Sequence, residues 1–331
     1  MLATVILTVT LNPSLDKTYS VPGFAVGRDL VAARVELSPG GKGLNVASFA
    51  RALGAEVTAT GILAGHTGRH VEELLAGRGI AGDFVWVPGE TRSCHIIHDP
   101  ESGTLSQIKE PGPAVPPGTQ AAVAAKVHAL AGRARVVVFS GSLPPGMDAG
   151  IYRALVAAVR AQGVHAVLDA AGEPLALGLA ARPDVIKPNL EELDDLAVWL
   201  RLPAGPCPAG GATDPEAVRR WAAAAGGEIR SRFRTDVVAS LGPLGAVVVD
   251  AGDAHALVPP PIEAVNTISC GDAVVAAIAL GLARGQGLLE SARLGVAMAT
   301  AKAGRFATGL VDPEDAARVL PHVRIERLVD P

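Results

Sequence analysis

The chain has 331 residues, of which 49% are hydrophobic and 19% are charged, and its formal net charge is −4. This length is enough for one large α/β domain with a substantial core, so we expect a single domain over residues 1–331. Lysine and arginine are scattered rather than clustered, which argues against a nucleic-acid partner or an anionic membrane surface.

The first predicted element, Thr4–Leu11, is an apolar, β-rich run that ends at the turn signal Asn12-Pro13. This segment lacks the basic residues of a signal peptide, and the longest apolar run, Ala273–Ala283, is too short to span a bilayer. The three cysteines are widely spaced with no CxxC pair, which argues against a disulfide framework or a zinc site. We therefore expect a protein of the reducing cytoplasm.

Strands and helices are predicted to alternate along the rest of the chain. Short, partly exposed strands are expected over Lys17–Glu36, and the glycine-rich break PGGKG (Pro39–Gly43) precedes a helix over Leu44–Leu53. Further strands are expected at Val57–Leu63, Phe84–Val87, Val136–Ser140, Ala166–Asp169, Val185–Lys187, Asp236–Ser240 and Ala246–Asp250, and a hairpin at Arg92–His98 and Thr104–Ile108. Further helices are expected at Gly68–Arg78, Pro117–Ala131, Gly150–Gln162, Leu190–Leu200, Pro215–Ala225 and Ala273–Ala283, with a surface loop between Leu202 and Gly211. The alternation predicts an α/β fold with a mostly parallel sheet covered on both faces.

Polar or glycine-rich residues follow many of the predicted strands. In an open α/β sheet, ligands bind beyond the carboxyl ends of the strands. The segments that fall there are Asn12 and Asp16, the glycines of 39–43, Ser140-Gly141-Ser142, Asn189, Ser240-Leu241-Gly242 and the turn at 269–272. We therefore predict one ligand site that is built from many strand ends.

The stretch Asn266–Gly285 places a short polar turn before an apolar helix. The first amides of a helix have no intrahelical partners and lie at the positive end of its dipole, so Ser269, Cys270 and Gly271 can donate to an anion. Asp272 adds a carboxylate beside this anion hole, and phosphoryl transfer needs a base next to such donors. For an isolated Gly-Asp pair, the alternative is an N-cap aspartate on a core helix.

Three further segments also have a structural alternative. Asn189 and Glu192 share one helical face and could both reach a hydrated Mg²⁺, but they could equally be a helix cap with an acidic first turn. The glycines of 39–43 could form a ligand loop or a tight turn, and Ser240–Gly245 could be a hairpin turn. No P-loop motif and no G-x-G-x-x-G motif occurs, which makes an NAD-dependent oxidoreductase the last of the alternatives.

Taken together, the segments are more specific than any one of them. They are LNPSLD (Leu11–Asp16), PGGKGLNVA (Pro39–Ala47), TR (Thr91-Arg92), SGSLPPG (Ser140–Gly146), KPNLEEL (Lys187–Leu193), SLGPLGA (Ser240–Ala246) and GDA (Gly271–Ala273). In order and spacing they resemble the ribokinase/PfkB family of carbohydrate kinases, in the branch that includes 1-phosphofructokinase and tagatose-6-phosphate kinase. The resemblance runs from about Leu2 to Gly309. It implies a three-layer α/β/α ribokinase-like fold with a mostly parallel central sheet and a small protruding β-sheet lid.

The resemblance implies transfer of the γ-phosphoryl group of ATP, with Mg²⁺, to a hydroxyl of a phosphorylated ketohexose. Asp272 takes the role of the catalytic base, and the amides of Ser269, Cys270, Gly271 and Asp272 form the anion hole. The residues that match substrate-binding positions are Asp16, Gly41, Lys42, Asn45, Arg92 and Ser140, of which Lys42 and Arg92 are expected to bind the substrate phosphate. Those that match nucleotide-binding positions are Lys187, Asn189, Ser240, Gly242 and Gly245, and Glu192 with Asn189 matches the motif that organises Mg²⁺. The adenine is expected between the 265–268 segment and the helix around Met298–Lys302.

The lid that the resemblance implies corresponds to about residues 12–38 and 90–110. In relatives it closes the site and often pairs between two subunits, so a homodimer through the lid is expected. Closure would exclude water, which otherwise competes as a phosphoryl acceptor.

Departures from the family pattern bear on the choice of substrate. Leu30-Val31 replaces an Asn-Arg pair that helps to bind the substrate phosphate, so that binding would depend mainly on Lys42 and Arg92. The segment Gly89–Asp99 looks more like tagatose-6-phosphate kinase, although Ser93 stands where an Asn is common there. Ser269-Cys270 replaces Gly followed by a small residue, and the simplest interpretation is a tolerated small side chain. The alternative hypothesis is that the positive helix end lowers the pKa of the Cys270 thiol and makes it sensitive to alkylation.

Two alternative functions remain open. The first is the same chemistry on an unphosphorylated sugar or nucleoside, which Leu30-Val31 motivates. The second is a catalytically silent sugar-phosphate sensor on a kinase scaffold. Asp272, Asn189 and Glu192 argue against the sensor, because a silent binder needs neither the base nor the Mg²⁺ motif.

Overall fold

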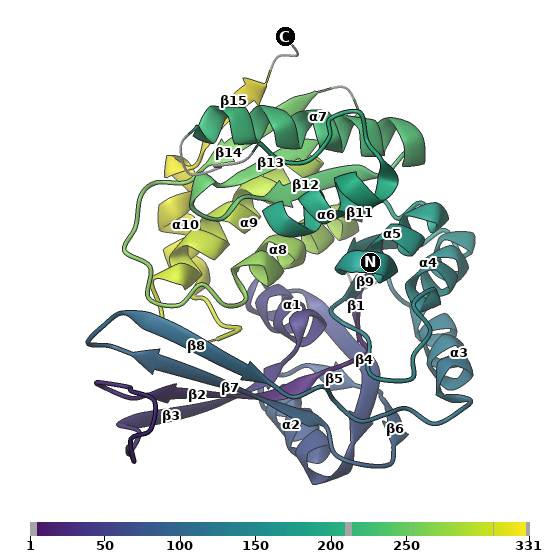
Figure 1. Cartoon of the computed structure of the whole chain (residues 1–331). Coiled ribbons are helices and arrows are strands. Elements are labelled where there is room, and N and C mark those ends of the chain that lie inside the picture. The colour runs from purple at the N-terminus through teal and green to yellow at the C-terminus, as the bar shows by residue number, and fades with distance from the viewer. Residues whose placement is uncertain (1–4, 209–213, 252, 307, 329–331) are drawn as a thin grey trace.

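The computed structural model describes residues 5–208, 214–251, 253–306 and 308–328. Over these residues, an 11-stranded sheet forms the middle layer of the molecule (Figure 1). Its strands are β1 (Val5–Thr10), β4 (Glu56–Ala64), β5 (Ala81–Gly82), β6 (Val85–Val87), β9 (Val136–Ser140), β10 (His165–Asp169), β11 (Val185–Ile186), β12 (Asp236–Ser240), β13 (Ala246–Val249), β14 (Ala254–Val258) and β15 (Arg324–Leu328). The order is β15-β14-β13-β12-β11-β10-β9-β1-β4-β5, with β6 paired to β4. From β12 to β5 neighbouring strands are parallel, and β13 to β15 extend one edge as antiparallel strands. The predicted mostly parallel sheet is confirmed.

Helices cover both faces of this sheet (Figure 1). One layer holds α1 (Lys42–Ala52), α2 (Gly65–Gly77), α8 (Cys270–Arg284), α9 (Leu288–Ala303) and α10 (Pro313–Val319). The other holds α3 (Thr119–Ala131), α4 (Ile151–Ala161), α5 (Gly172–Gly178), α6 (Leu190–Leu200) and α7 (Pro215–Phe233). Single 3₁₀ turns lie at Leu179–Ala181, Gly242–Leu244 and Leu320–His322. The result is the expected three-layer α/β/α arrangement.

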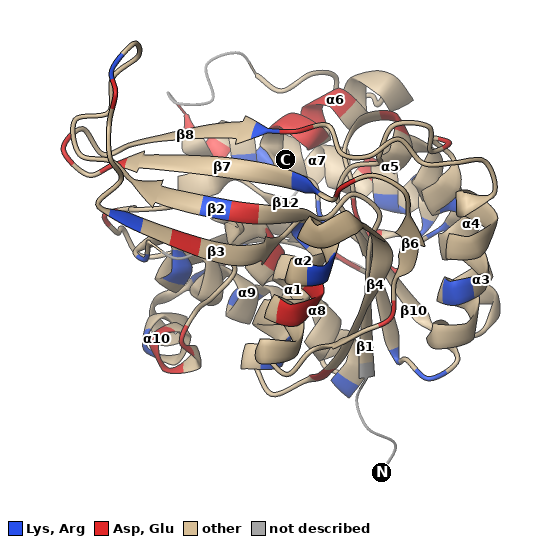
Figure 2. Cartoon of the chain, turned by 90° about the horizontal axis from the view of Figure 1, so that it is seen from below, with Lys and Arg blue, Asp and Glu red and all other residues tan. Residues whose placement is uncertain are grey.

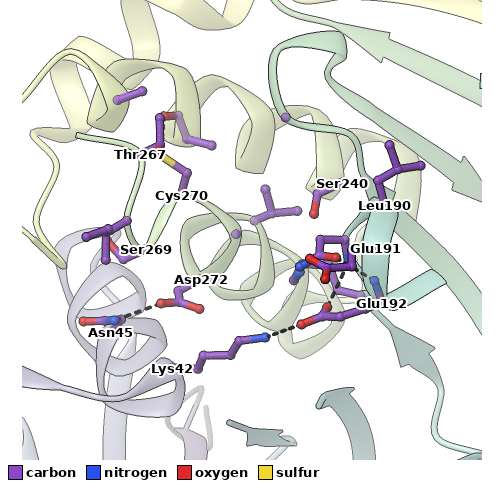
Figure 3. A pocket seen from close by; sticks show the side chains of 18 of the residues that line it. Lys42, Asn45, Leu190, Glu191, Glu192, Ser240, Thr267, Ser269, Cys270 and Asp272 are labelled. Carbon is purple, nitrogen blue, oxygen red and sulfur yellow. Dashed lines mark hydrogen bonds and ion pairs between the residues drawn. The ribbon is translucent and has the colours of Figure 1, made fainter. Parts of the chain in front are cut away.

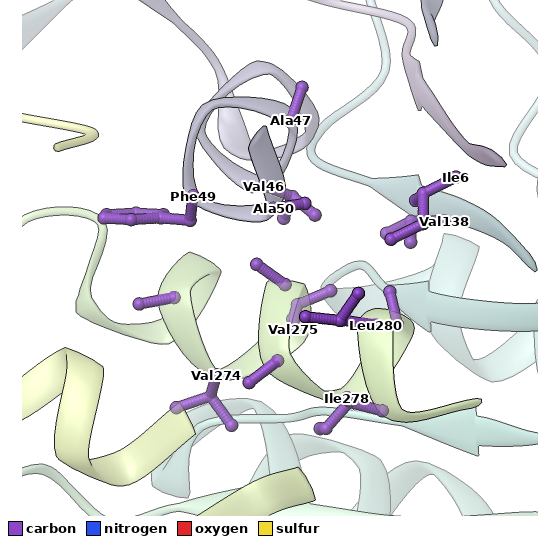
Figure 4. Packing of buried hydrophobic residues seen from close by; sticks show 14 of the residues in the cluster. Ile6, Val46, Ala47, Phe49, Ala50, Val138, Val274, Val275, Ile278 and Leu280 are labelled. Atoms are coloured by element: carbon purple, nitrogen blue, oxygen red, sulfur yellow. The ribbon is translucent and has the colours of Figure 1, made fainter. Parts of the chain in front are cut away.

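The two helix layers bury separate cores because successive side chains of a strand point to opposite faces. In β1, Ile6 belongs to the core under α1 and α8, and Leu7 to the core under the other layer. Residues 273–281 of α8 are buried on all sides, as expected for a helix that is apolar around its whole circumference. Figure 4 shows α1 residues such as Phe49 and Val46 packing towards α8. Burying one such side chain contributes about 1.5–3 kcal/mol, so this packing fixes the position of α8 relative to α1.

A separate four-stranded sheet, which we call the small sheet, projects beside the large one (Figure 1). Its strands are β3 (Arg34–Gly40), β2 (Ser14–Ser20), β7 (Arg92–Asp99) and β8 (Thr104–Lys109), in the order β3-β2-β7-β8. Only β2 and β7 are parallel among these described pairs. Acidic and basic side chains are interspersed on β2 and β3, as Figure 2 shows.

Some boundaries differ from the sequence-based expectation. The helix expected at Pro215–Ala225 continues to Phe233 through a glycine pair, because Gly226 allows close packing: a Cβ there would lie 2.9 Å from Val249 Cγ2. Instead of several short strands over Lys17–Glu36, the chain forms β2 and β3 with residues 21–33 between them. Of the loop expected from Leu202 to Gly211, the part after residue 208 lies outside the described residues. Among the described residues, no helix is long and apolar enough to cross a membrane.

Candidate active site

A cavity of about 1220 Å³ lies where the carboxyl ends of the parallel strands face the small sheet. Its volume exceeds the range of about 300–1,000 Å³ that is typical of sites for one small molecule. The predicted site residues that line it are Asp16, Gly41, Lys42, Asn45, Arg92, Lys187, Asn189, Glu192, Ser240, Gly242, Gly245, Ser269, Cys270, Gly271 and Asp272. The structure therefore brings these residues, from six separate segments of the chain, to one place.

The small sheet supplies one wall of the cavity. Its strand register places Asp16, Cys94 and Lys109 side by side across β2, β7 and β8, and all three line the cavity. Asp16 is 4% exposed and accepts a 2.7 Å hydrogen bond from Ser14 Oγ. Burial raises the pKa of Asp16, and the Ser14 hydrogen bond and the charge of Arg92 partly offset this.

The guanidinium of Arg92 is held by backbone carbonyls at the edge of the cavity. Its Nε and Nη2 donate to the Asn12 carbonyl at 3.2 and 2.9 Å, and its Nη1 donates to the Glu110 carbonyl at 3.1 Å. These bonds fix the plane of the guanidinium. Arg92 lines the cavity beside Asp16, so a positive charge with a fixed orientation is available to a ligand there.

Helix α1 begins inside the cavity because the chain turns sharply at Gly41. This residue has φ of 97°, and a Cβ there would lie 3.0 Å from the Cα of Pro13, so a glycine is required at this position. The turn places Lys42 and Asn45, one helical turn apart, on the cavity wall. Asn45 Nδ2 donates a 2.8 Å hydrogen bond to Asp272 Oδ2, as drawn in Figure 3.

Asp272 lies in the first turn of α8 and is 5% exposed. Burial, followed by the negative charge of Asp169, raises the pKa of Asp272 to about 7. The charges of Lys42 and Lys187 and the Asn45 hydrogen bond oppose this shift. A carboxyl group with a pKa near neutrality can both accept and release a proton at physiological pH, as a general base must.

A buried cluster of charges lies next to Asp272. Asp169, at the end of β10, has one oxygen 3.3 Å from Lys42 Nζ and 3.4 Å from Lys187 Nζ. Its other oxygen accepts a 3.0 Å hydrogen bond from Ser140. Burial would raise the pKa of Asp169, but the ammonium groups of Lys187 and Lys42 lower it below its usual value. Asp169 therefore stays ionised and holds two lysines at the cavity wall.

Lys42 connects this cluster to α6. Its Nζ lies 3.1 Å from Glu192 Oε1, as Figure 3 shows. Burial would lower the pKa of Lys42, but the charges of Asp169, Glu192 and Asp272 raise it above its ordinary value. Lys42 is therefore a permanent cation between the small-sheet wall and the α6 wall.

The amides of the predicted anion hole lie at the start of α8. The amide of Cys270 donates to the Thr267 carbonyl at 3.3 Å, and that of Asp272 donates to the Ser269 carbonyl at 3.0 Å. Among the described residues, the Gly271 amide has no such partner outside its helix, and a Cβ on Gly271 would lie 3.3 Å from Lys187 Nζ. The Cys270 and Asp272 amides are therefore bound within the turn, whereas the Gly271 amide lies next to the Lys187 ammonium; a hole formed by all four amides stays a prediction.

Asn189 and Glu192 form a helix cap at the start of α6, which the sequence offered as the alternative to a Mg²⁺ site. Asn189 Oδ1 accepts from the Glu192 amide at 2.8 Å, and Glu192 Oε2 accepts from the Asn189 amide at 2.9 Å. Glu192 Oε1 remains on the cavity side, next to Lys42. Among the described residues, no group of three or more His, Cys, Asp or Glu side chains could hold a metal ion. A metal at this site would therefore bind through one carboxylate, its own waters and a ligand.

The hypothesis of an activated Cys270 thiol is wrong. Burial raises the pKa of Cys270 to about 11, and the nearby charge of Lys302 only partly opposes this. The thiol also lies 3.3 Å from the Ala299 carbonyl, to which it donates. Desolvation outweighs the charge of Lys302 at this position, so the thiolate is disfavoured.

The sequence-based reasoning missed Asp169 and placed Ser140 differently. Ser140 is fully buried and does not line the cavity; its hydroxyl donates a hydrogen bond to Asp169. The next two residues, Gly141 and Ser142, line the cavity instead. A signal for Asp169 existed, because it is the polar residue that ends a buried strand, like Ser140 and Ser240. Lys109 gave no comparable signal, since only the strand register of the small sheet shows that it faces the cavity.

Comparisons with known proteins bear on what this cavity binds. A family model described as pfkB family carbohydrate kinase matches residues 9–315. The chain is similar to 1-phosphofructokinase of Rhodobacter capsulatus, with 34% identity over 98% of each chain. It is also similar to tagatose-6-phosphate kinase of Staphylococcus epidermidis, with 31% identity over 84% of this chain and 85% of the relative. Among solved structures, phosphofructokinase-2 from Escherichia coli in complex with substrates and products superposes with a TM-score of 0.86 and 32% identity, covering 96% of this chain and 99% of that one.

Proposed function

The chain belongs to the pfkB family of carbohydrate kinases, and on that premise we propose that it transfers the γ-phosphoryl group of ATP to a hydroxyl of a phosphorylated ketohexose. The observation that carries this proposal is the buried carboxylate of Asp272, which Asn45 orients and which lies near the buried Lys187 and the partly exposed Lys42. A phosphoryl-transfer site needs a base for the attacking hydroxyl and fixed positive charge for the transferred group.

Asp272 would accept the proton of the attacking sugar hydroxyl. Its raised pKa, about 7, makes the carboxylate a stronger proton acceptor than an exposed aspartate. The Asn45 hydrogen bond to one oxygen leaves the other free for the substrate. The sugar would lie against the small-sheet wall, where Asp16 accepts hydrogen bonds from hydroxyl groups and Arg92 binds the phosphate that the acceptor already carries.

Lys187, Lys42 and the Gly271 amide would neutralise the charge that develops on the transferred phosphoryl group. Both lysines are held by Asp169, so they need no reorganisation when the reaction occurs. The nucleotide would occupy the opposite end of the cavity, which Asn189, the Ser240–Gly245 segment and α9 line. The small sheet, residues 12–38 and 90–110, would act as the lid of a single catalytic domain and exclude water.

Kinases of this family act with a divalent metal, and we propose Mg²⁺ here. The residues fit such an ion in its usual form, because Mg²⁺ keeps several waters and needs only one or two carboxylates together with nucleotide phosphates. Glu192 would hold it through water, with Asn189 fixing the Glu192 backbone through the helix cap. An ion held there would supply positive charge to the phosphate oxygens of the nucleotide.

Turnover of a panel of acceptors with MgATP, measured as ADP release, tests the proposal. The panel holds tagatose 6-phosphate, fructose 6-phosphate, fructose 1-phosphate and the corresponding free sugars. We expect fast turnover on one or more of the phosphorylated ketohexoses only. The absence of turnover on all of them, with nucleotide still bound, would refute the proposed acceptor class.

A kinase of an unphosphorylated sugar is the second candidate. It is favoured by Leu30-Val31, which puts two apolar residues, with Val31 91% exposed, where the branch carries a phosphate-binding pair. Fast turnover on a free sugar in the same panel would select this function.

We further propose that two copies pair through the small sheet, as expected for a homodimer in the cytoplasm. The face of the sheet away from the cavity carries exposed apolar side chains, among them Val35, Leu37 and Ile108, and cross-strand register places Leu37 and Ile108 in one row. Phosphofructokinase-2 from Escherichia coli is known in a tetrameric inhibited form, which supports self-association in this family. Sedimentation of wild type and Ile108→Asp tests this, and an unchanged mass on substitution would argue against the interface.

A further inference from the structure

Lys302 is a lysine that the proposed chemistry does not use, and it is completely buried. It lies in the last turn of α9 with an exposed fraction of 0%. Its ammonium donates a 2.7 Å hydrogen bond to a neutral group, the carbonyl of Asn266. Burying a charge without a carboxylate partner is costly, so such a lysine needs a reason to be present.

The Asn266 carbonyl belongs to a segment that α9 and the chain after it hold on several sides. The amides of Val265 and Asn266 both donate to the Ala303 carbonyl, at 2.8 and 3.0 Å. Asn266 Nδ2 donates to the Phe306 carbonyl at 2.8 Å, and Asn266 Oδ1 accepts from the Ile268 amide at 2.9 Å. The other polar groups of Asn266 are therefore already hydrogen-bonded, and the bond from Lys302 to its carbonyl adds a further constraint on its position.

This segment leads directly into the turn that carries the catalytic groups. Ser269, three residues after Asn266, has φ of 68°, a left-handed conformation that is strained for a residue with a side chain. Its Oγ accepts from the Gly309 amide at 3.1 Å, and the next residue, Cys270, donates to the Ala299 carbonyl of α9. The strained turn thus persists because contacts from both sides hold it.

We propose that Lys302 is a built-in cation that positions this turn and adds positive charge behind the anion hole of α8. This inference rests on the proposed kinase function. Lys302 does not line the cavity, whereas its neighbours Thr300 and Ala303 do, so it acts as a positioning residue and touches no substrate.

The charges that face Lys302 agree with this role. Cys270 and Asp272, both from the first turn of α8, are the titratable groups that raise the pKa of Lys302. Burial is the larger effect and lowers this pKa to about 8, so the ammonium is present at neutral pH and is lost in mildly alkaline solution. The nearby Arg305 pairs with Asp315 instead.

The size of the ammonium group provides a sharp test. Backbone carbonyls bind K⁺ as well as ammonium, so truncating Lys302 opens a space beside the Asn266 carbonyl that a free cation can enter. A side chain that fills the space without charge cannot be rescued in this way. The two kinds of variant therefore separate the effect of the charge from that of packing.

The experiment compares Lys302→Met, Lys302→Ala and Lys302→Arg with wild type, in buffer free of K⁺ and NH₄⁺ and then with either ion added. Ser291→Ala is the control, because Ser291 is a buried residue at the other end of the same helix. For each protein, we would measure kcat, the KM for ATP and the melting temperature. The pH dependence of kcat is measured from pH 6 to pH 10, because this interval brackets the Lys302 pKa of about 8.

We expect kcat of Lys302→Met to fall about tenfold or more, as for the loss of one anion-hole group, while its melting temperature stays equal or rises. NH₄⁺ or K⁺ should restore part of the activity of Lys302→Ala but not of Lys302→Met. In wild type, kcat should decline above about pH 8, and in Lys302→Arg this decline should move to higher pH. Should Lys302→Ala fail to fold, Lys302→Met and Lys302→Arg decide the question.

A Lys302→Met enzyme with the kcat and pH profile of wild type would overturn the inference while leaving the kinase function intact. A fall in kcat that merely parallels a loss of folded protein would also overturn it. A wild-type protein without kinase activity on any acceptor would instead overturn the proposed function, and the inference with it.

Discussion

Asn45 Nδ2 donates a 2.8 Å hydrogen bond to Asp272 Oδ2, which joins two helix N-termini that are 227 residues apart in the chain. The buried contact between α1 and α8 sets this distance, because Phe49 and Val275 belong to the same core. The core between the helices therefore determines the orientation of the carboxylate that we propose as the catalytic base. Loss of packing there would be felt as loss of activity.

Replacing Asp272 by Asn removes the base and keeps its shape. We expect kcat to fall roughly 10²- to 10⁴-fold, the usual contribution of a general base, while ATP binding changes little. The variant should also be more stable than wild type at pH 8. The folded-state pKa of Asp272 is raised to about 7, so its contribution to stability is present at acidic pH and is lost as pH rises towards 7.

Steady-state kinetics and calorimetric ATP binding measure the first two effects. Thermal unfolding at pH 5 and pH 8 measures the third, because these pH values lie on either side of the Asp272 pKa of about 7. Asn45→Ala is an informative companion, because it keeps the base but removes its orienting hydrogen bond. An Asp272→Asn enzyme with wild-type kcat would remove Asp272 from the mechanism.

The activity should depend on pH through the same group. We expect kcat/KM to rise with pH through an apparent pKa of about 7, because the carboxylate form of Asp272 is the active one. Asp169 raises this pKa by its negative charge, so Asp169→Asn should move the rising limb to lower pH even though the rate also falls. A limb that stays in place in Asp169→Asn would argue that Asp272 is not the group that titrates.

The sequence predicts the layers of this fold well because the strands are buried and the helices have regular spacing. Val136–Ser140, for example, is predicted and observed with the same bounds. The α7 helix shows where local reasoning fails: Gly226-Gly227 is a breaker by propensity, yet contact with Val249 makes a glycine favourable there. Tertiary packing decides such cases.

The same distinction holds in the site. Glycine turns and strand-end residues such as Asp272 and Asn189 are marked in the sequence by their position between elements. Lys302 is not marked in this way, because its importance lies in which groups surround it after folding. Asp169 does end a strand, but its role depends on the two lysines that the fold places beside it. The raised pKa of Cys270 could not be predicted either, since it depends on how far the folded chain removes the thiol from water.

Arg92→Ala tests the proposed binding of the acceptor's phosphate. We expect the KM for a phosphorylated acceptor to rise at least about tenfold, which corresponds to roughly 1.4 kcal/mol, with the KM for ATP nearly unchanged. Because Arg92 also ties the Asn12 and Glu110 carbonyls together, part of the effect could come from the loosened wall. Arg92→Lys keeps the charge without the planar fork and separates the two contributions. An equal rise in KM for free sugars would argue against a phosphate contact.

Cys270 should react slowly with alkylating agents. Burial raises its pKa to about 11, so only a very small fraction is thiolate at pH 7.5, a value at which a typical exposed thiol is already partly ionised. We expect iodoacetamide to modify Cys270 more slowly than free cysteine, as measured by mass spectrometry of the peptide that contains it. The partly exposed Cys207 is an internal comparison in the same digest. Faster reaction at Cys270 than in the free amino acid would contradict the structure at the start of α8.

Gly40→Ala should disturb sugar binding without touching the nucleotide end. A Cβ on Gly40 would lie 2.0 Å from Asp16 Oδ1, so the carboxylate of Asp16 must move away from its place beside Ser14. We expect the KM for the acceptor to rise about tenfold or more while the KM for ATP stays within about twofold. Gly227→Ala is the matched control, because a Cβ there meets no atom within 4 Å and should stabilise α7 by up to about 1 kcal/mol. If Gly40→Ala raised both KM values equally, Asp16 would not be a contact of the sugar alone.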